Sequence, residues 1–173
     1  MLFRTLLILT FLGAAPLSAQ PVEPLMSVER MLGILLALDP EARPEGRGVE
    51  LTLGDVPVRV VMDPRANRMR AMVPVASADG LSEADLTRIM QANFDTALDA
   101  RYAIAQGRLW SVYIHPLEEL GRDQLISGIG QAVNLARSYG TLYTSGAQIY
   151  GRGDSADIYT DLIEDLLDRG APL

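Results

Sequence analysis

The sequence predicts one α+β domain in which an antiparallel sheet of about five strands packs with helices, in the order α-βββ-α-ββ-α, followed by an acidic C-terminal helix. Two patterns carry this prediction. Between residues 49 and 75, apolar residues alternate with other residues in three successive segments, which is typical of strands with one buried face. Before and after these segments, apolar residues recur at the spacing of amphipathic helices. A chain of 173 residues is long enough to bury the core of such a domain.

Residues 1–19 have the order of a secretory signal peptide. Arg4 precedes an apolar run over residues 5–12, and small residues lead to Ala19. The run is too short to span a bilayer, which takes about 20 apolar residues. We therefore expect cleavage after Ala19 or after Ala15, no stable membrane insertion afterwards, and a periplasmic or secreted protein. A retained anchor helix is the alternative.

The composition narrows the classes of function. The net charge is −7 and all basic residues are arginines, whereas nucleic-acid binding needs clustered positive charge. The chain has no cysteine and one histidine, which excludes thiol catalysis and zinc–thiolate sites. We expect no nucleic-acid partner, no metal and no cofactor.

The first elements follow from local signals. Residues 20–26 are expected to form a flexible lead, and Ser27 is placed to cap a helix that ends at Asp39-Pro40. Residues 40–48 contain prolines and glycines and are expected to form a loop.

Three strands are predicted between residues 49 and 75, joined by turns at Gly54-Asp55 and at residues 63–67. Pro57 and Pro74 lack backbone donors, so each should lie at an edge, a bulge or a strand end. The residues expected on the buried face are Val49, Leu51, Leu53, Val56, Val58, Val60, Met62, Met69, Ala71, Val73 and Val75.

A second helix is predicted over residues 82–98, with Ser82 and Asp85 as a capping box. Asn93 lies within its apolar stripe. A buried amide needs hydrogen-bond partners, so Asn93 is expected to bond a neighbouring backbone, with a dimer interface as the alternative. The stripe expected to face the core is Leu86, Ile89, Met90, Asn93, Ala97 and Leu98.

A hairpin and two further helices complete the predicted fold. The hairpin joins residues 101–105 and 108–115 through a Gln106-Gly107 turn. On its second arm Trp110, Val112 and Ile114 are expected to face the core, with Leu109, Ser111, Tyr113 and His115 on the other face.

The third helix is predicted over residues 122–139 and is expected to end at Gly140. Within it, Gly128 and Gly130 are expected to allow close packing. The segment 141–173 combines a glycine-rich stretch with an acidic helix over residues 155–168, which either folds back on its domain or binds a partner.

Arg59, Arg68 and Arg70 form the candidate partner-binding site. All three lie on the outward side of the predicted meander, where neighbouring strands bring side chains together. They are expected to attract an acidic polypeptide at the outer face or a free edge of the meander. Ion pairing with Glu50 and Asp63 on the same face is the alternative.

No catalytic residue is identified. His115, before a proline at a strand end, is interpreted as a surface or hydrogen-bonded histidine. Gly128-Ile129-Gly130 lies in a helix pattern and is not a dinucleotide-binding motif. In Arg152-Gly153-Asp154, the aspartate is interpreted as a helix cap.

Residues 27–140 resemble the fold family shared by the YbjN-domain proteins and the Tir-chaperone-type chaperones of type III secretion. The resemblance covers the meander, the helix with Gln91-Ala92-Asn93-Phe94, and the hairpin sequence 103–110 before the third helix. It implies a non-enzymatic module that holds a polypeptide partner against apolar surface, and it is compatible with a homodimer. The expected function is therefore an exported protein-interaction or chaperone-like module. A small-ligand or lipid-binding protein is the alternative, and an enzyme is third.

Overall fold

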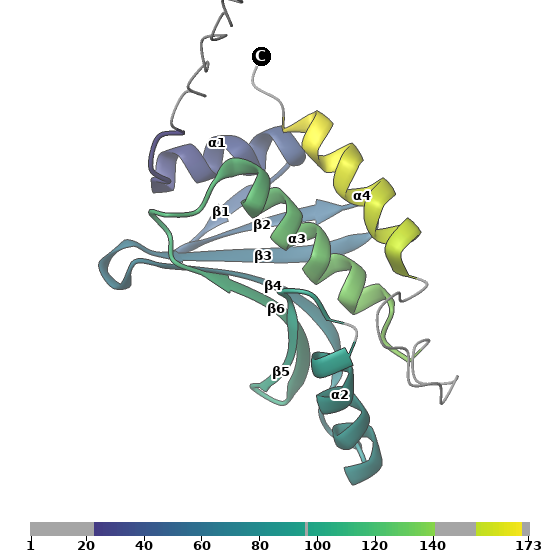
Figure 1. The fold of residues 1–173 in the computed structure, drawn as a ribbon. Helices are drawn as coiled ribbons and strands as arrows, with labels where there is room; N and C mark the ends of the chain where they lie inside the picture. Colours follow the sequence, from purple (N-terminus) through teal and green to yellow (C-terminus); the bar gives the residue numbers. More distant parts are fainter. Residues whose placement is uncertain (1–22, 96, 141–154, 171–173) are drawn as a thin grey trace, which may run out of the picture.

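The computed structural model describes residues 23–95, 97–140 and 155–170 (Figure 1). The predicted signal peptide and Arg152-Gly153-Asp154 lie outside these residues. The elements are α1 (Val28–Leu38), β1 (Arg43–Glu45), β2 (Gly48–Leu53), β3 (Val56–Asp63), a 3-10 turn (Pro64–Ala66), β4 (Arg68–Ser77), α2 (Glu83–Asp95), β5 (Arg101–Ala105), β6 (Arg108–His115), α3 (Arg122–Arg137) and α4 (Ser155–Arg169).

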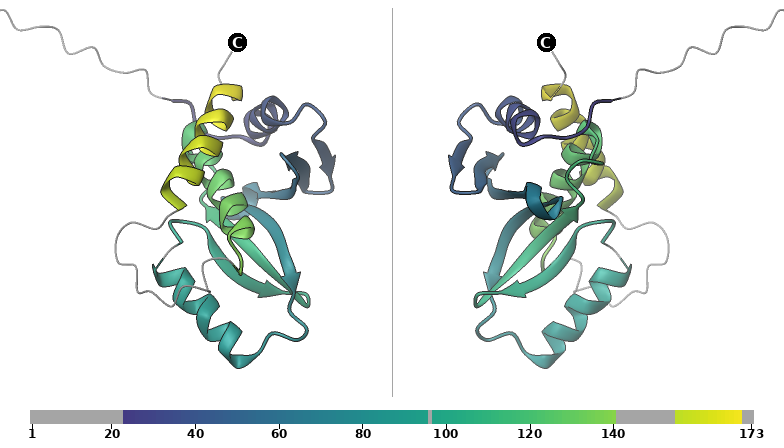
Figure 2. Two further views of the ribbon diagram at one scale, coloured as in Figure 1. Left: turned by 90° about the vertical axis from the view of Figure 1, so that its right-hand side faces the viewer. Right: turned by 90° about the vertical axis from the view of Figure 1, so that its left-hand side faces the viewer.

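One antiparallel sheet of six strands, in the order β1-β2-β3-β4-β6-β5, forms the centre of the domain. α1 and α3 pack on one face of this sheet, and α4 packs on α3 (Figure 1). α2 contacts β5 and stands apart from the other three helices (Figure 2). The predicted α+β fold class and element order are confirmed. None of the helices in the described ranges is both long enough and apolar enough to cross a membrane.

The predicted loop over residues 40–48 contains a short strand, β1, which brings the sheet to six strands rather than about five. Glu45 pairs with Gly48 around a tight turn in which Gly46 has a φ of +59°. All three residues of β1 are exposed. The strand therefore has no buried face, and its sequence lacks the alternation by which strands are recognised.

The predicted meander is confirmed. Its apolar residues face the helices and are buried from Val49 to Val73, while Val56 and Val75 are partly buried. Pro57 lies near the start of β3, beyond the residues that pair with β4. Pro74 lies at a register shift between β4 and β6. Both prolines therefore occupy positions where a missing backbone donor is tolerated.

The caps predicted for the first two helices are also confirmed. The Ser27 side chain accepts a hydrogen bond from the Arg30 backbone N–H at 3.1 Å. In the capping box of α2, the Ser82 hydroxyl accepts from the Asp85 N–H at 3.2 Å, and the Asp85 carboxylate accepts from the Ser82 N–H at 3.0 Å. Local interactions over three residues fix both helix starts.

β6 faces the opposite way from the prediction. Leu109, Ser111 and Tyr113 are buried on the α3 side of the sheet, and Trp110, Val112 and Ile114 lie on the other side. The pairing with β4 aligns Tyr113 with the buried Ala71 and Ser111 with the buried Val73.

Gly128 explains how α3 accommodates the Tyr113 ring. A Cβ atom at Gly128 would lie 2.3 Å from Cε1 of Tyr113, so only glycine fits there without a shift. A Cβ atom at Gly130 would lie 2.7 Å from Cγ1 of Ile163 on α4. The close packing predicted for the two glycines is confirmed, and it favours the observed direction of β6.

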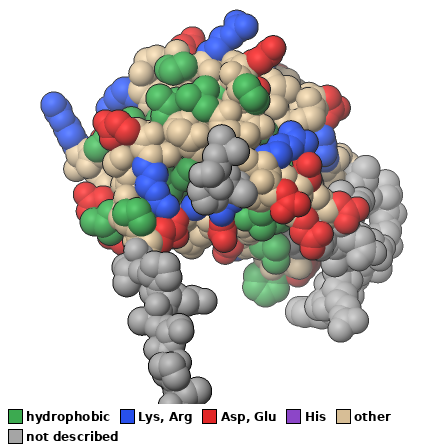
Figure 3. All heavy atoms as spheres, turned by 90° about the horizontal axis from the view of Figure 1, so that it is seen from above, with side chains coloured by type: hydrophobic (Ala, Val, Ile, Leu, Met, Phe, Trp, Pro, Cys, Tyr) green, Lys and Arg blue, Asp and Glu red, His purple; other side chains and the backbone are tan. Residues whose placement is uncertain are grey.

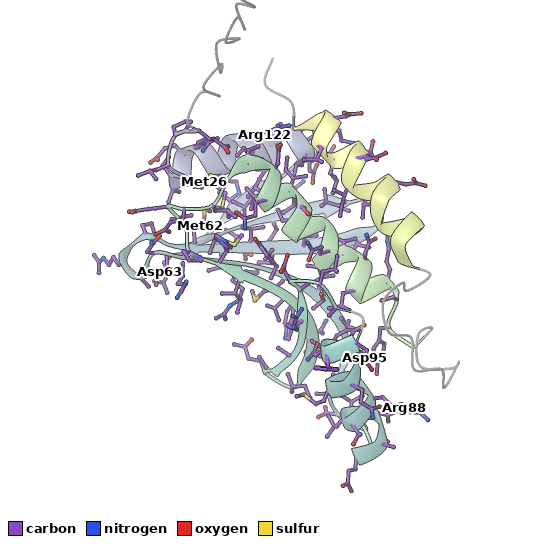
Figure 4. The ribbon with its side chains drawn as sticks, viewed as in Figure 1. Met26, Met62, Asp63, Arg88, Asp95 and Arg122 are labelled. Atoms are coloured by element: carbon purple, nitrogen blue, oxygen red, sulfur yellow. The ribbon has the colours of Figure 1, made fainter. Side chains whose placement is uncertain are left out.

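The C-terminal helix folds back on its own domain. Leu166 is fully buried in the core cluster, and Arg122 at the start of α3 donates a 2.7 Å hydrogen bond to the Leu167 carbonyl and another to the Gly170 carbonyl. Figure 4 shows Arg122 beside the C-terminal end of α4 and places Met26 and Met62 in the core on the helix side of the sheet. A cation among the last carbonyls of a helix is favourable.

Candidate functional site

The sheet face opposite α1, α3 and α4 forms the candidate site, and we call it the open face. Its side chains come from β3, β4, β5 and β6. Hydrogen-bonded pairing places them in rows across the strands, where directly opposed side chains are about 4.5–5.5 Å apart at Cβ. The open face is made of Arg59, Val61, Arg68, Arg70, Met72, Pro74, Ala103, Trp110, Val112 and Ile114.

The centre of the open face is apolar. Met72 pairs with Val112, and Trp110 pairs with Pro74 on one side and with Ala103 on the other. The Trp110 indole N–H donates to the Ala105 carbonyl at 3.1 Å, and the Arg108 guanidinium lies 5.8 Å from the ring centroid. These contacts hold a large aromatic ring half-buried on the floor of the face.

Three hollows adjoin one another across this face. The largest, about 610 Å³, is lined by Arg59, Arg70, Met72, Trp110 and Ile114, among others. A second hollow of about 380 Å³ shares Arg70, Met72 and Ile114 with it. A third of about 400 Å³ shares Arg59 and Trp110. Because they share these residues, the hollows form one groove that is open to solvent.

The three arginines predicted for partner binding lie together on this groove, but only one of them is neutralised. Arg59 forms ion pairs with Glu50 at 3.2 Å and Glu45 at 3.4 Å. Arg68 and Arg70 form no ion pair within 4.0 Å among the described residues. The alternative expectation of ion pairing therefore applies to Arg59. Among the described residues, Arg68 has no ion pair within 4.0 Å, although its charge contributes to lowering the pKa of Glu119, and Arg70 has no ion pair.

The surroundings of Arg59 hold a surplus of negative charge. A hydrogen bond with the Glu45 carboxyl raises the pKa of Glu50, and the nearby charge of Glu45 adds to this effect. Asp63, the other expected partner, instead lies 3.5 Å from Arg47. Figure 3 shows acidic and basic side chains interspersed on the end of the molecule that carries α1 and α4. On the open face, Arg68 and Arg70 have no ion pair among the described residues.

The structure leaves no free edge on the predicted meander, because β1 pairs with β2 and β6 pairs with β4. The edges of the whole sheet are β1 and β5. At β5, the Asn93 side chain accepts from the Tyr102 N–H at 2.7 Å and donates to the Tyr102 carbonyl at 3.2 Å. Asn93 thus bonds a neighbouring backbone, as predicted, and it takes the place of a further strand.

Half of the apolar stripe that was predicted to face the core from α2 is exposed. Ile89 is buried, but Met90 is 67% exposed and Phe94, which the stripe did not include, is 79% exposed. Leu86 and Leu98 are exposed as well. Helical spacing shows that a helix has an apolar side, but it does not show whether another element packs on that side. In the structure, β5 packs on only one edge of the apolar side of α2. We call Leu86, Met90 and Phe94 on α2, together with Leu98 in the bend after the helix ends at Asp95, the α2 stripe.

His115 has structural neighbours. Its ring stacks on Tyr113 with centroids 6.1 Å apart, and its Nδ1 and Nε2 lie 2.8 Å from the Pro116 carbonyl and 3.1 Å from Gln124 Nε2. In the described ranges, no three His, Asp or Glu side chains are grouped as metal ligands would be.

Sequence reasoning missed Asn67, which joins two distant segments. Its side-chain oxygen accepts from the backbone N–H groups of Leu117 and Glu118 at 2.9 and 2.8 Å. Its amide donates to the Glu119 carboxylate, and this bond lowers the pKa of Glu119. The signal available in the sequence was an asparagine at the end of the predicted turn, since asparagine tolerates the left-handed backbone that Asn67 adopts, with a φ of 47°.

No family model matches the sequence, and no curated protein matches it. Among solved structures, a chain of the ExsC-ExsE complex has a TM-score of 0.53 and 14% identity, covering 70% of this chain and 100% of that chain. A chain of the HopA1-SchA chaperone-effector complex has a TM-score of 0.49 and 10% identity, covering 63% of this chain and 91% of its own.

A chain from the complex of the Yersinia pestis type III secretion chaperone SycH with a stable fragment of YscM2 has a TM-score of 0.46 and 14% identity, covering 61% of this chain and 95% of its own. The relation to YbjN-domain proteins stays a prediction. The match to the ExsC-ExsE complex shows that this chain shares its fold with a chain of that complex.

Proposed function

We propose that this chain is an exported, non-enzymatic module of the chaperone-like kind that holds a polypeptide partner against the open face. The observation that carries the proposal is the apolar floor around Met72, Trp110 and Ile114, which no described helix covers. A contiguous exposed apolar surface on a soluble domain is typical of an interaction site. Arg68 and Arg70 beside it add attraction for acidic groups.

The fold supports this proposal, because a chain of similar fold occurs in a complex of two proteins, ExsC and ExsE. The chemistry of the open face supports it too. Apolar side chains and guanidinium groups are suited to burying and pairing with a partner, whereas acid–base catalysis needs proton-exchanging groups positioned beside one another.

Site-directed photo-crosslinking in cells tests the proposal. A benzoylphenylalanine at position 72 lies on the floor of the groove, and one at position 104 lies on the same hairpin region but outside the groove. We expect position 72 to crosslink a defined polypeptide, which mass spectrometry identifies, and position 104 not to do so. The same crosslinks from both positions, or none from position 72, would refute binding at the open face.

The arginines are tested on the partner identified in this way. Replacing Arg59, Arg68 and Arg70 with Gln should lower the affinity and flatten its dependence on salt, since exposed charges are screened near physiological ionic strength. Arg88→Gln, an exposed change on α2, is the matched control. If the triple variant keeps the wild-type affinity and salt dependence, the arginines only balance nearby acidic residues and do not contribute to binding.

A small ligand or lipid is the alternative occupant. A carrier of this kind normally encloses most of its ligand, but the hollows of the open face open to solvent. Native mass spectrometry of the protein purified from its own cells separates the two cases. A stoichiometric bound lipid or small molecule would favour the alternative.

Export is part of the proposal and rests on Arg4, the apolar run over residues 5–12 and Ala19. We expect the mature chain to begin at Gln20 and to fractionate with the periplasm or the medium. N-terminal sequencing and cell fractionation provide the measurement. A membrane-bound chain that retains Met1 would contradict export by cleavage.

A homodimer through the α2 stripe is the second proposed partnership. Among the large apolar residues exposed in the described ranges, half belong to this stripe. α2 stands apart from the other helices (Figure 2), so a second copy of the chain can approach α2 without contacting the other helices of the first copy. A stripe on one helix can pair with the same stripe of a second copy in a two-fold arrangement.

Sedimentation equilibrium tests the dimer. Phe94→Glu should convert a dimer to a monomer, while Leu25→Glu, an exposed apolar position away from α2, should leave the dimer intact. A wild-type chain that is monomeric, or a Phe94→Glu variant that stays dimeric, would exclude this interface.

A further inference from the structure

Both edges of the sheet are protected against a partner strand, β1 by its composition and β5 at Tyr102. β1 is three residues long, its side chains are exposed, and Pro44 at its centre has no N–H to donate. Short, charged and proline-containing edges are a common protection against strand addition. At β5, Asn93 occupies the N–H and the carbonyl of Tyr102.

The interior strands offer no backbone groups to a partner either. β2, β3, β4 and β6 are each paired on both sides, so the open face presents side chains only. An extended segment on this face would leave many of its own N–H and carbonyl groups without partners. Such groups are costly to bury, whereas an α-helix bonds them internally.

The size of the face suits one helix. The open face is built on the four adjacent strands β3, β4, β6 and β5. Strands about 4.8 Å apart give such a face a width of roughly 15 Å, and a helix with its side chains is about 10–12 Å across. A helix can therefore lie in the groove with its apolar side on Met72, Val112 and Ile114.

The arginines of the open face indicate which residues should flank the apolar side of a bound helix. Arg68 and Arg70 border the floor without ion-pair partners among the described residues. Carboxylates beside the apolar stripe of a bound helix would meet them, and charge-assisted hydrogen bonds to arginine are favourable. On the basis of the proposed function, we propose that the open face recognises an amphipathic α-helix with acidic flanks, and not an added strand.

Synthetic peptides test this proposal on the full-length mature protein. Two peptides of identical Leu, Glu and Ala composition are compared. One has leucines at helical spacing with glutamates beside them, and the other alternates leucine with the remaining residues. Trp110 is the only tryptophan in the chain and lies in the groove, so its emission reports binding of peptides that lack tryptophan.

We expect the helical peptide to bind at least about tenfold more tightly than the alternating one. Ile114→Glu should abolish binding. The matched control Ile104→Glu should preserve it, because Ile104 is 51% exposed against 53% for Ile114 but lies off the groove. Arg70→Gln should weaken binding about two- to fivefold at low salt and less at high salt.

Two outcomes would overturn the proposal. If the alternating peptide binds as tightly as the helical one, the recognised segment is not a helix. If neither binds while position 72 still crosslinks a polypeptide in cells, the proposed function stands and the helical class of partner is wrong.

Discussion

Replacing Leu109 with alanine should destabilise the domain far more than the same change at Ile114. The two side chains have equal numbers of carbon atoms and lie on one strand with opposite orientation. Leu109 is 0% exposed on the α3 side, and Ile114 is 53% exposed on the open face. Truncating a buried leucine removes its transfer free energy and leaves a cavity, at a cost of about 2–5 kcal/mol.

Ile114→Ala should cost about 1 kcal/mol, from the half of its side chain that is buried and from the lower strand preference of alanine. Urea unfolding followed by far-ultraviolet circular dichroism measures both free energies, with the slope of the transition as a check on two-state behaviour. If Ile114→Ala costs more than Leu109→Ala, β6 faces the other way. The open face would then lose its apolar floor, and the proposed site would fail.

Three further predictions concern the packing and the sheet edge. Gly128→Ala should cost about 1–3 kcal/mol because its Cβ would lie 2.3 Å from the Tyr113 ring, while Gly33→Ala, with no atom within 4 Å, should gain about 0.5–1 kcal/mol. Burial raises the pKa of Tyr113 to about 12, so the folded chain holds this proton more tightly than the unfolded chain. This stabilisation should be present below about pH 10 and be lost toward pH 12, and Tyr113→Phe should flatten that loss in alkaline unfolding curves. Asn93→Ala removes two bonds to Tyr102 and should cost about 1–3 kcal/mol in unfolding free energy, with higher oligomers from the opened edge in size-exclusion chromatography.

Features that depend on neighbours in sequence could be predicted. The Ser27 cap and the Ser82–Asp85 capping box involve residues three apart, and the meander has a strict period of two. β1 could not be predicted, because both of its faces are exposed and nothing alternates. Its existence depends on the tight turn at Gly46 that folds it onto β2.

One half of the candidate site, its arginines, could be predicted from the sequence, and the other half, its apolar floor, could not. The shared side of Arg59, Arg68 and Arg70 follows from strand alternation alone. The apolar floor beneath them comes from β6, and both sides of β6 carry large apolar residues, so alternation does not choose between them. The choice depends on a fit between Tyr113 and Gly128, which no local pattern encodes.

The affinity of the crosslinked partner for Ile114→Glu and Ile104→Glu, measured by isothermal titration calorimetry, tests the central claim most directly. Binding of a polypeptide at the open face predicts a loss of more than about tenfold for Ile114→Glu, because a carboxylate would replace apolar contact and repel an acidic partner. Ile104→Glu, equally exposed but off the groove, should bind as the wild type does. Equal affinities of the two variants would contradict the claim.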